Sequence, residues 1–180
     1  MAKRMFVAIE LPEDLRNKLA ATASGLSGLK AVPAPQIHLT LCFLGNVPLE
    51  NDATLRETLS AIVPTEFPLT AQGIGTFGCS RKPMVLWAGV EDPENALPPL
   101  AAAVREAAQT AGIAIDDRPF TPHITLGRRR GGSPAKLRIF LREHGEETFG
   151  PFTACGFTLF ESVLTPDGPI HAAVLRVPGP

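Results

Sequence analysis

The four-residue pattern His-x-Thr-Leu occurs twice in this chain, at residues 38–41 and again at residues 123–126. The chain has four histidines in 180 residues, and the two copies stand almost half its length apart. Histidine is the side chain best suited to proton transfer near neutral pH. Two histidines at equivalent places of a duplicated fold therefore predict one acid and one base that face a shared substrate.

Strand geometry places each histidine beside its threonine. Residues i and i+2 of a strand share a face, so His38 and Thr40 point one way and the apolar residues between them point the other. His123 and Thr125 follow the same rule. If the apolar residues fill the core, both polar faces are left to line one surface. A single such pattern is more often a half-buried strand, and the matched pair is what indicates a site.

These side chains suit displacement at the phosphorus of a phosphodiester. The reaction needs a nucleophile deprotonated on one side and a leaving oxygen protonated on the other, and two opposed histidines supply both. Hydroxyls donate hydrogen bonds to the non-bridging oxygens, and a guanidinium stabilises their charge. The sequence has none of the usual metal-ligand clusters, so neither a metal nor another cofactor is expected. His144 and His171 are expected to be loop or surface histidines.

Two parts of the chain repeat one order of elements. Residues 6–13 and 87–94 are β-prone apolar runs that end in Glu-x-Pro-Glu. Each precedes a helical pattern, over 12–24 and 95–111, then a proline-containing loop and the His-x-Thr-Leu strand. Further helices are expected over 49–62 and after the loop at 131–134, with strands near 67–77, 85–90, 152–164 and 172–177.

This order predicts an α+β fold. We expect two related, interleaved lobes with a pseudo-twofold axis, one motif in each, and antiparallel or mixed sheets that line a central cleft with helices outside. Residues 1–180 are expected to form a single bilobal domain. Because the two lobes complete one cleft within one chain, a monomer is expected.

Composition and charge narrow the setting. Apolar residues make up 44% and aromatic residues 6%, which is ordinary for a globular protein. No apolar run is long enough for a transmembrane helix, and the N-terminus lacks a signal-peptide core. Three scattered cysteines argue against a disulfide framework, so a cytoplasmic location is expected. The net charge of −1 provides no global basic field, although residues 118–142 carry only basic charges.

The motifs and their surroundings resemble the two-histidine phosphoesterase superfamily, and within it the RNA 2′,3′-cyclic phosphodiesterase family, also called 2′-5′ RNA ligase. The resemblance covers nearly the whole chain and rests on residues 4–12, 38–45, 85–90 and 118–128, of which the last are the most specific. It implies hydrolysis of a terminal 2′,3′-cyclic phosphate to a 2′-phosphomonoester. It also implies an ATP-independent ligation in which a 5′-hydroxyl replaces water.

The resemblance implies roles for the motif residues. His38 would be the proton donor to the leaving 3′-oxygen, and His123 the proton acceptor that activates water. Pseudo-symmetry by itself gives no reason to prefer this order. Thr40 and Thr125 would hold phosphate oxygens.

An arginine five residues after the second histidine is frequent in the family, and here it is Arg128. Strand parity puts Arg128 on the face opposite His123. An isolated glycine in a strand often marks a bulge, so Gly127 could re-aim it. Arg130 is the alternative phosphate-binding residue, and a solvated basic turn is the alternative interpretation of residues 128–130, Arg129 included.

The C-terminal segment departs from the family pattern. Residues 161–171 resemble a segment that commonly carries tyrosine near its end, but His171 occupies roughly that place and the chain has no tyrosine. Base stacking would therefore come from a phenylalanine, Trp87 or a histidine. Phe43 and Phe120 flank the motifs and are candidates, although a place in the core is the favoured interpretation for either ring. The nucleobase preference is left open.

Four functions remain open. The first is metal-independent hydrolysis of RNA 2′,3′-cyclic phosphate ends. The second keeps the chemistry but uses a small cyclic nucleotide such as ADP-ribose 1″,2″-cyclic phosphate, or a linear oligonucleotide; the near-neutral charge favours short substrates. The third is a non-catalytic RNA-end binding module, against which the paired histidines argue. The fourth is a metal site built from His38 and His123, which would need further ligands.

Overall fold

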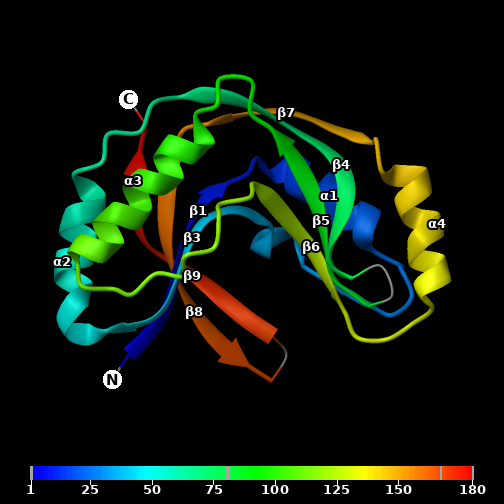
Figure 1. The fold of residues 1–180 in the computed structure, drawn as a ribbon, viewed down its shortest axis with the longest axis horizontal. Coiled ribbons are helices and arrows are strands. Elements are labelled where there is room, and N and C mark those ends of the chain that lie inside the picture. The colour runs from blue at the N-terminus through cyan, green and yellow to red at the C-terminus, as the bar shows by residue number, and fades with distance from the viewer. Residues whose placement is uncertain (1, 80–81, 167, 180) are drawn as a thin grey trace.

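The computed structural model describes residues 2–79, 82–166 and 168–179 (Figure 1). The elements in chain order are β1 (Ala2–Glu10), α1 (Glu13–Ala23), β2 (Leu29–Ala31), the 3₁₀ helix η1 (Ala34–Gln36), β3 (His38–Pro48), α2 (Leu49–Ser60), β4 (Phe67–Cys79), β5 (Lys82–Glu91), α3 (Leu97–Thr110), β6 (His123–Arg129), α4 (Pro134–His144), β7 (Thr148–Ala154), β8 (Gly156–Thr165) and β9 (Gly168–Pro178).

The strands form one curled sheet. Its order is β7-β4-β5-β6-β3-β1-β8-β9, with β2 paired to β6, and the pairings are antiparallel. Figure 1 shows α2 and α3 near one end of the molecule and α4 at the other. The predicted α+β class with antiparallel strands and outer helices is confirmed. Among the described helices, none has the length and apolar character that a membrane crossing requires.

The helices form where the apolar periodicity predicts them. In α1, the buried residues Leu15, Leu19 and Ala23 recur every four positions and make one apolar stripe. Glu13 and Asp14 occupy its first turn, where negative charge complements the helix dipole. The helices expected over 49–62 and 95–111, and the short helix after residue 134, are present as α2, α3 and α4. The short elements β2 and η1 were not anticipated.

The single strand expected over residues 152–164 is wrong. β7 ends at Ala154 and pairs with β4, whereas β8 begins at Gly156 and pairs with β1 and β9. Gly156 has a φ of 96°, and a Cβ atom there would collide with the main-chain oxygen of Val177. Only glycine fits this conformation and this close approach, so the chain changes direction here.

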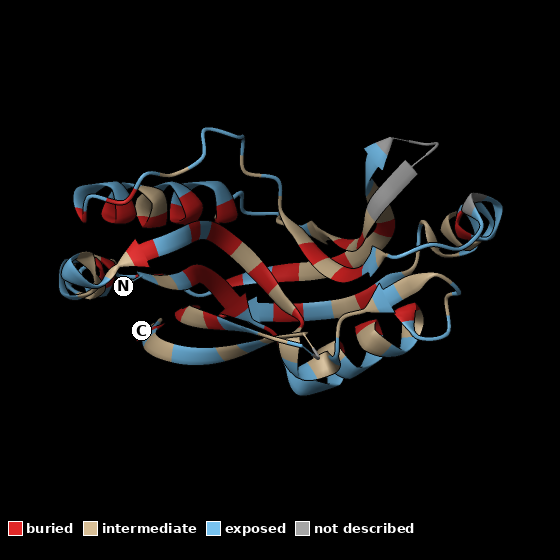
Figure 2. Ribbon diagram, turned by 90° about the horizontal axis from the view of Figure 1, so that it is seen from below, coloured by how far each residue is buried: buried red, intermediate tan, exposed pale blue. Residues whose placement is uncertain are grey.

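Each half contributes a strand–helix–strand unit, β1–α1–β3 and β5–α3–β6, in which the two strands pair. The helices are exchanged between the units. α1 packs against β2, η1, β6 and β7, while α3 packs against α2 and β3. Figure 2 shows buried residues running along the middle strands and the inner helix faces, and one apolar cluster contains residues of both halves.

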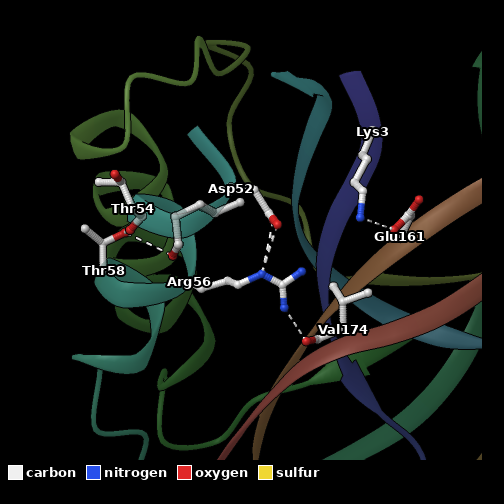
Figure 3. Close-up of polar contacts among 8 residues, drawn as sticks. Lys3, Asp52, Thr54, Arg56, Thr58, Glu161 and Val174 are labelled. Carbon is white, nitrogen blue, oxygen red and sulfur yellow. Dashed lines mark hydrogen bonds and ion pairs between the residues drawn. The ribbon is translucent and has the colours of Figure 1, made fainter. Parts of the chain in front are cut away.

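Polar contacts attach the last two strands to the rest of the fold (Figure 3). Arg56 of α2 donates through Nε to Asp52 of its own helix and through Nη1 to the main-chain oxygen of Val174 in β9. The Lys3 ammonium of β1 lies 3.0 Å from the Glu161 carboxylate of β8. These contacts hold β8 and β9 against the rest of the sheet.

Candidate active site

The two motif strands are neighbours in the middle of the sheet. β3 and β6 pair at Leu39 and Ile124, and both side chains are 0% exposed. They face the side on which α3 packs against β3 and α1 against β6. Because side chains alternate along a strand, the opposite side holds the polar motif residues. This side, called the motif face below, carries His38, Thr40, His123 and Thr125, all of them half-buried.

The antiparallel register brings the two motifs together in inverted order. With Leu39 opposite Ile124, His38 lies on the side of Thr125, and Thr40 lies on the side of His123. The two histidines are close enough that a charge on His123 lowers the pKa of His38. The two strands therefore bring two imidazoles and two hydroxyls together on the motif face, as strand parity predicts.

Both histidine rings are oriented by the same hydrogen bond. Nδ1 of His38 lies 2.7 Å from the main-chain oxygen of Gln36, and Nδ1 of His123 lies 2.8 Å from that of Thr121. A carbonyl oxygen can only accept, so Nδ1 carries a proton in each ring. Nε2 is then the ring nitrogen that keeps a free lone pair on both histidines.

His38 lies in a cluster of aromatic rings. Its centroid is 4.7 Å from that of Phe6 with the planes at 27°, 6.2 Å from Phe160, and 5.6 Å from His171. Burial lowers the pKa of His38 to about 4, the Gln36 carbonyl opposes the shift, and charge on His171 or His123 adds to it. In the free protein at pH 7, His38 is therefore neutral.

His123 has different neighbours. Phe77 meets it edge to face, with 4.7 Å between centroids and an interplanar angle of 88°. Phe77 also contacts Trp87, which pairs with Thr125 across β5 and β6. The Trp87 Nε1 atom is buried without a hydrogen-bond partner among the described residues. The sequence did not indicate Phe77, because only the pairing of β4 with β5 brings it to the motif face.

Arg128 lies on the motif face by strand register. Val85 pairs with Arg128 and Leu86 with Gly127, but Trp87 pairs with Thr125, so β6 holds one extra residue there. Val85 and Trp87 share a face of β5, and the irregularity therefore returns Arg128 to the side of Thr125. The side chain of Arg128 is exposed. Arg130 follows the end of β6 and is also exposed.

The two phenylalanines proposed for base stacking have different environments. Phe43 is 59% exposed and lies 6.3 Å from the ring of Phe6, at the margin of the aromatic cluster. Phe120 is partly buried and packs against the apolar core. Phe43 is therefore accessible to a nucleobase, whereas part of the Phe120 ring is already used in packing.

The expectation that His171 is a loop or surface residue is wrong. His171 lies in β9, half-buried, with its ring 4.9 Å from Phe6 and 5.6 Å from His38. Its position in a segment where the resembling family carries an aromatic residue was the signal for this placement. His144 ends α4 and contacts the Glu147 carboxylate at 2.6 Å, apart from the motif residues.

No metal-binding cluster accompanies the histidines. Within residues 2–79, 82–166 and 168–179, no group of three or more His, Cys, Asp or Glu side chains is placed to hold a metal ion. A cavity of about 360 Å³ lies elsewhere, where Glu10, Cys155 and Arg176 are among its lining residues. The described side chains of the motif face provide imidazole, hydroxyl and guanidinium groups.

Comparisons with known proteins identify the family to which the chain is similar. Residues 6–163 match the 2′-5′ RNA ligase superfamily. The chain is 36% identical over 171 residues to the RNA 2′,3′-cyclic phosphodiesterase of Archaeoglobus fulgidus, covering 93% of this chain and 96% of that protein. It is 31% identical over 177 residues to the Methanocaldococcus jannaschii protein of the same name, covering 95% and 98%. The crystal structure of Escherichia coli LigT complexed with 3′-AMP is similar, with a TM-score of 0.80, 28% identity and 99% coverage of each chain.

Proposed function

The chain belongs to the 2′-5′ RNA ligase superfamily, and we propose that it hydrolyses terminal 2′,3′-cyclic phosphodiesters of RNA to 2′-phosphomonoesters without a metal ion. The observation that carries the proposal is the pair of histidines on neighbouring strands, each oriented by a main-chain carbonyl so that Nε2 is the reactive nitrogen. The relatives named RNA 2′,3′-cyclic phosphodiesterase support this choice of substrate. The proposal also includes that the protein acts as a monomer in the cytoplasm.

The proposed reaction uses one proton transfer at each histidine. Nε2 of His123 takes a proton from water as the water oxygen bonds to phosphorus. The bond from phosphorus to the 3′-oxygen breaks, and Nε2 of His38 gives that oxygen a proton. Each such transfer contributes typically about 10²–10⁴-fold to the rate. If a 5′-hydroxyl takes the place of water, the same step forms a 2′-5′ linkage.

His38 must acquire its proton before it can act as the acid. Its pKa of about 4 leaves it neutral in the free protein at pH 7. A phosphodiester carries a negative charge, and an opposite charge within a few ångströms favours the protonated imidazole. We therefore expect one proton to be taken up when the substrate binds, with His38 as its acceptor.

The other polar groups of the motif face suit the phosphate oxygens. Hydroxyls of Thr40 and Thr125 donate hydrogen bonds, and the guanidinium of Arg128 offsets the charge that develops in the transition state. Preorganised donors of this kind contribute most when they are fixed before the substrate arrives. The paired strands fix the main-chain positions of both threonines before the substrate binds.

The proposal is tested with an oligonucleotide that ends in a 2′,3′-cyclic phosphate, incubated with and without EDTA. We expect a product heavier by one water at the same rate in both, with the phosphate on the 2′-oxygen by end-group mapping. Loss of turnover on chelation would contradict the metal-free mechanism. Parallel reactions with 2′,3′-cyclic AMP and ADP-ribose 1″,2″-cyclic phosphate separate the RNA substrate from the small-nucleotide alternative. Tight binding without any product would instead support the binding module.

A further inference from the structure

The hairpin of β8 and β9 delivers a third histidine to the motif face. Phe6 pairs with Phe160 across β1 and β8, and Ser162, two residues further along β8, shares the face of Phe160. His171 pairs with Ser162 across β8 and β9, so its side chain points to the same face. Strand register therefore places the ring of His171 beside the aromatic cluster that contains His38.

The ring of His171 meets both His38 and Phe6 edge-on. Its plane makes an angle of 84° with His38, at 5.6 Å between centroids, and 78° with Phe6, at 4.9 Å. His38 and Phe6 are stacked on one another. The His38 ring is thus stacked on Phe6 and is also met at a near right angle by the ring of His171.

Gln36 connects His38 to the same hairpin. Its main-chain oxygen accepts the hydrogen bond from Nδ1 of His38, and its side-chain amide donates to the main-chain oxygen of Pro169, 2.7 Å away. Pro169 stands two residues before His171 in β9. The orientation of His38 and the position of His171 are therefore linked through one residue.

Burial of the His171 imidazole is less favourable than burial of a hydrocarbon ring would be. Its Nδ1 atom is buried and has no hydrogen-bond partner among the described residues. A hydrocarbon ring of similar shape would fill the space without an unpaired buried nitrogen. Burial lowers the pKa of His171, and the positive charge of Arg4 lowers it further. His171 is thus a neutral ring at neutral pH that can still become charged in acid.

We propose that His171 is a positioning residue for His38: its ring holds the His38 imidazole in place, and its protonation in acid opposes a positive charge on His38. The proposal rests on the proposed function, because it takes His38 as a reacting group. Among the described residues, the groups that meet or act on His171 are Arg4 and Phe6 of β1, His38 of β3 and Ser162 of β8. Of these, Arg4 and His38 are the ones that carry charge within the pH range of interest.

Three variants separate packing from charge. His171→Ala removes the ring, His171→Phe keeps an aromatic ring without a titrating nitrogen, and Ile170→Ala truncates the adjacent residue, which is 58% exposed. Each protein is assayed for kcat and KM on cyclic-phosphate RNA across pH. The titration of His38 is followed in parallel by NMR, and the melting temperature of each variant verifies that it folds.

We expect His171→Ala to lower kcat by roughly 10–100-fold with KM within about twofold, since a small misplacement of a reacting group has effects of this size. His171→Phe should restore most of kcat at pH 7. It should also raise the midpoint of the His38 titration by roughly half a pH unit, as expected from removing a charge at this separation in a water-like dielectric. Ile170→Ala should match the wild type in every measurement.

The outcomes separate this proposal from the proposed function. Unchanged kcat in His171→Ala, or an equal loss in Ile170→Ala, would overturn the positioning role. An unmoved His38 midpoint in His171→Phe would overturn the electrostatic part. If the wild type turns over no cyclic phosphate, the proposed function fails. The NMR measurement then still decides whether protonation of His171 opposes a positive charge on His38.

Discussion

His38 and His123 have the same local sequence but different surroundings. Both rings are oriented by a carbonyl two residues earlier, yet His38 is enclosed by Phe6, Phe160 and His171, whereas His123 meets the edge of Phe77. Sequence symmetry gave no reason to assign acid and base. The structure shows where that symmetry ends, because the rings of Phe6, Phe160 and His171 surround His38 and burial lowers its pKa.

Replacing either motif histidine should abolish hydrolysis of cyclic-phosphate RNA. We expect His38→Ala and His123→Ala each to lower kcat by about 10²–10⁴-fold, because each removes one proton transfer. The double variant should be little slower than either single variant, since residues that act as a unit are not additive. Steady-state kinetics measures this, with His144→Ala as the control that keeps wild-type rates. A near wild-type rate in His123→Ala would exclude it from the mechanism.

Arg128 and Arg130 provide a matched test of the irregularity in β6. Arg128→Ala should lower kcat/KM by roughly 10–100-fold, as expected for loss of a charge-assisted hydrogen bond to phosphate. Arg130→Ala removes the same charge beyond the end of the strand and should change kcat/KM by less than about threefold. Equal losses in both variants would instead indicate a general electrostatic effect, which added salt would weaken.

The buried position of His38 predicts a pH-dependent stability. Its pKa is about 4 in the folded protein and 6.5 ordinarily, so the unfolded chain binds the proton more readily between these values. The contribution of His38 to the free energy of unfolding should therefore be complete above pH 6.5 and fall by about 3 kcal/mol as the pH drops to 4. Denaturant titrations at pH 7, 5.5 and 4 measure it. His38→Asn should flatten most of this slope, and an unchanged slope would rule out His38 as its source.

At the scale of elements, local patterns predict helices well and strand boundaries poorly. The stripe of Leu15, Leu19 and Ala23 was enough to place α1, because a helix uses neighbours within its own segment. The break between β7 and β8 depends on which distant strands accept each segment, and so does the face of Arg128. His171 was misplaced for the same reason, since its position follows from pairing with Ser162.

Gly156 should be the least replaceable glycine at an element boundary. Gly156→Ala combines a φ of 96° with a collision against the main chain of Val177. We expect a loss of at least about 2 kcal/mol in unfolding free energy, or roughly 4–8 °C in melting temperature. Gly25→Ala is the control, with a φ of 81° but no atom within 4 Å of the new Cβ. If both variants melt alike, the collision is relieved by a shift of β9.

The two halves of the whole molecule are interdependent. α1 of the first half packs on β6 and β7 of the second, and α3 packs on β3 of the first. The sequence predicted interleaved lobes from the repeat of strand, helix and motif strand. It could not show which helix covers which strand, because the two helices have interchangeable apolar stripes. This exchange supports the expectation of one domain over residues 1–180.

A single cooperative unfolding transition should follow from this exchange. Leu19→Ala in α1 deletes a side chain that is 0% exposed and should cost about 2–5 kcal/mol. Trp87, the only tryptophan, lies in the second half, so its fluorescence should report the full loss at the same midpoint as far-UV circular dichroism. Leu164→Ala, at a residue 67% exposed, is the control with little effect. If the midpoint of the Trp87 fluorescence transition is the same in Leu19→Ala as in the wild type, the two halves unfold separately.

The exchanged helices also constrain how the chain is made. α1 leaves the ribosome early, but the strands that cover its apolar stripe, β6 and β7, are synthesised more than a hundred residues later. At ordinary elongation rates that interval is on the order of ten seconds. The edge of β1 that pairs with β8 likewise stays unpaired until β8 has been synthesised. The nascent first half thus emerges with part of its apolar surface uncovered until β6, β7 and β8 have been made.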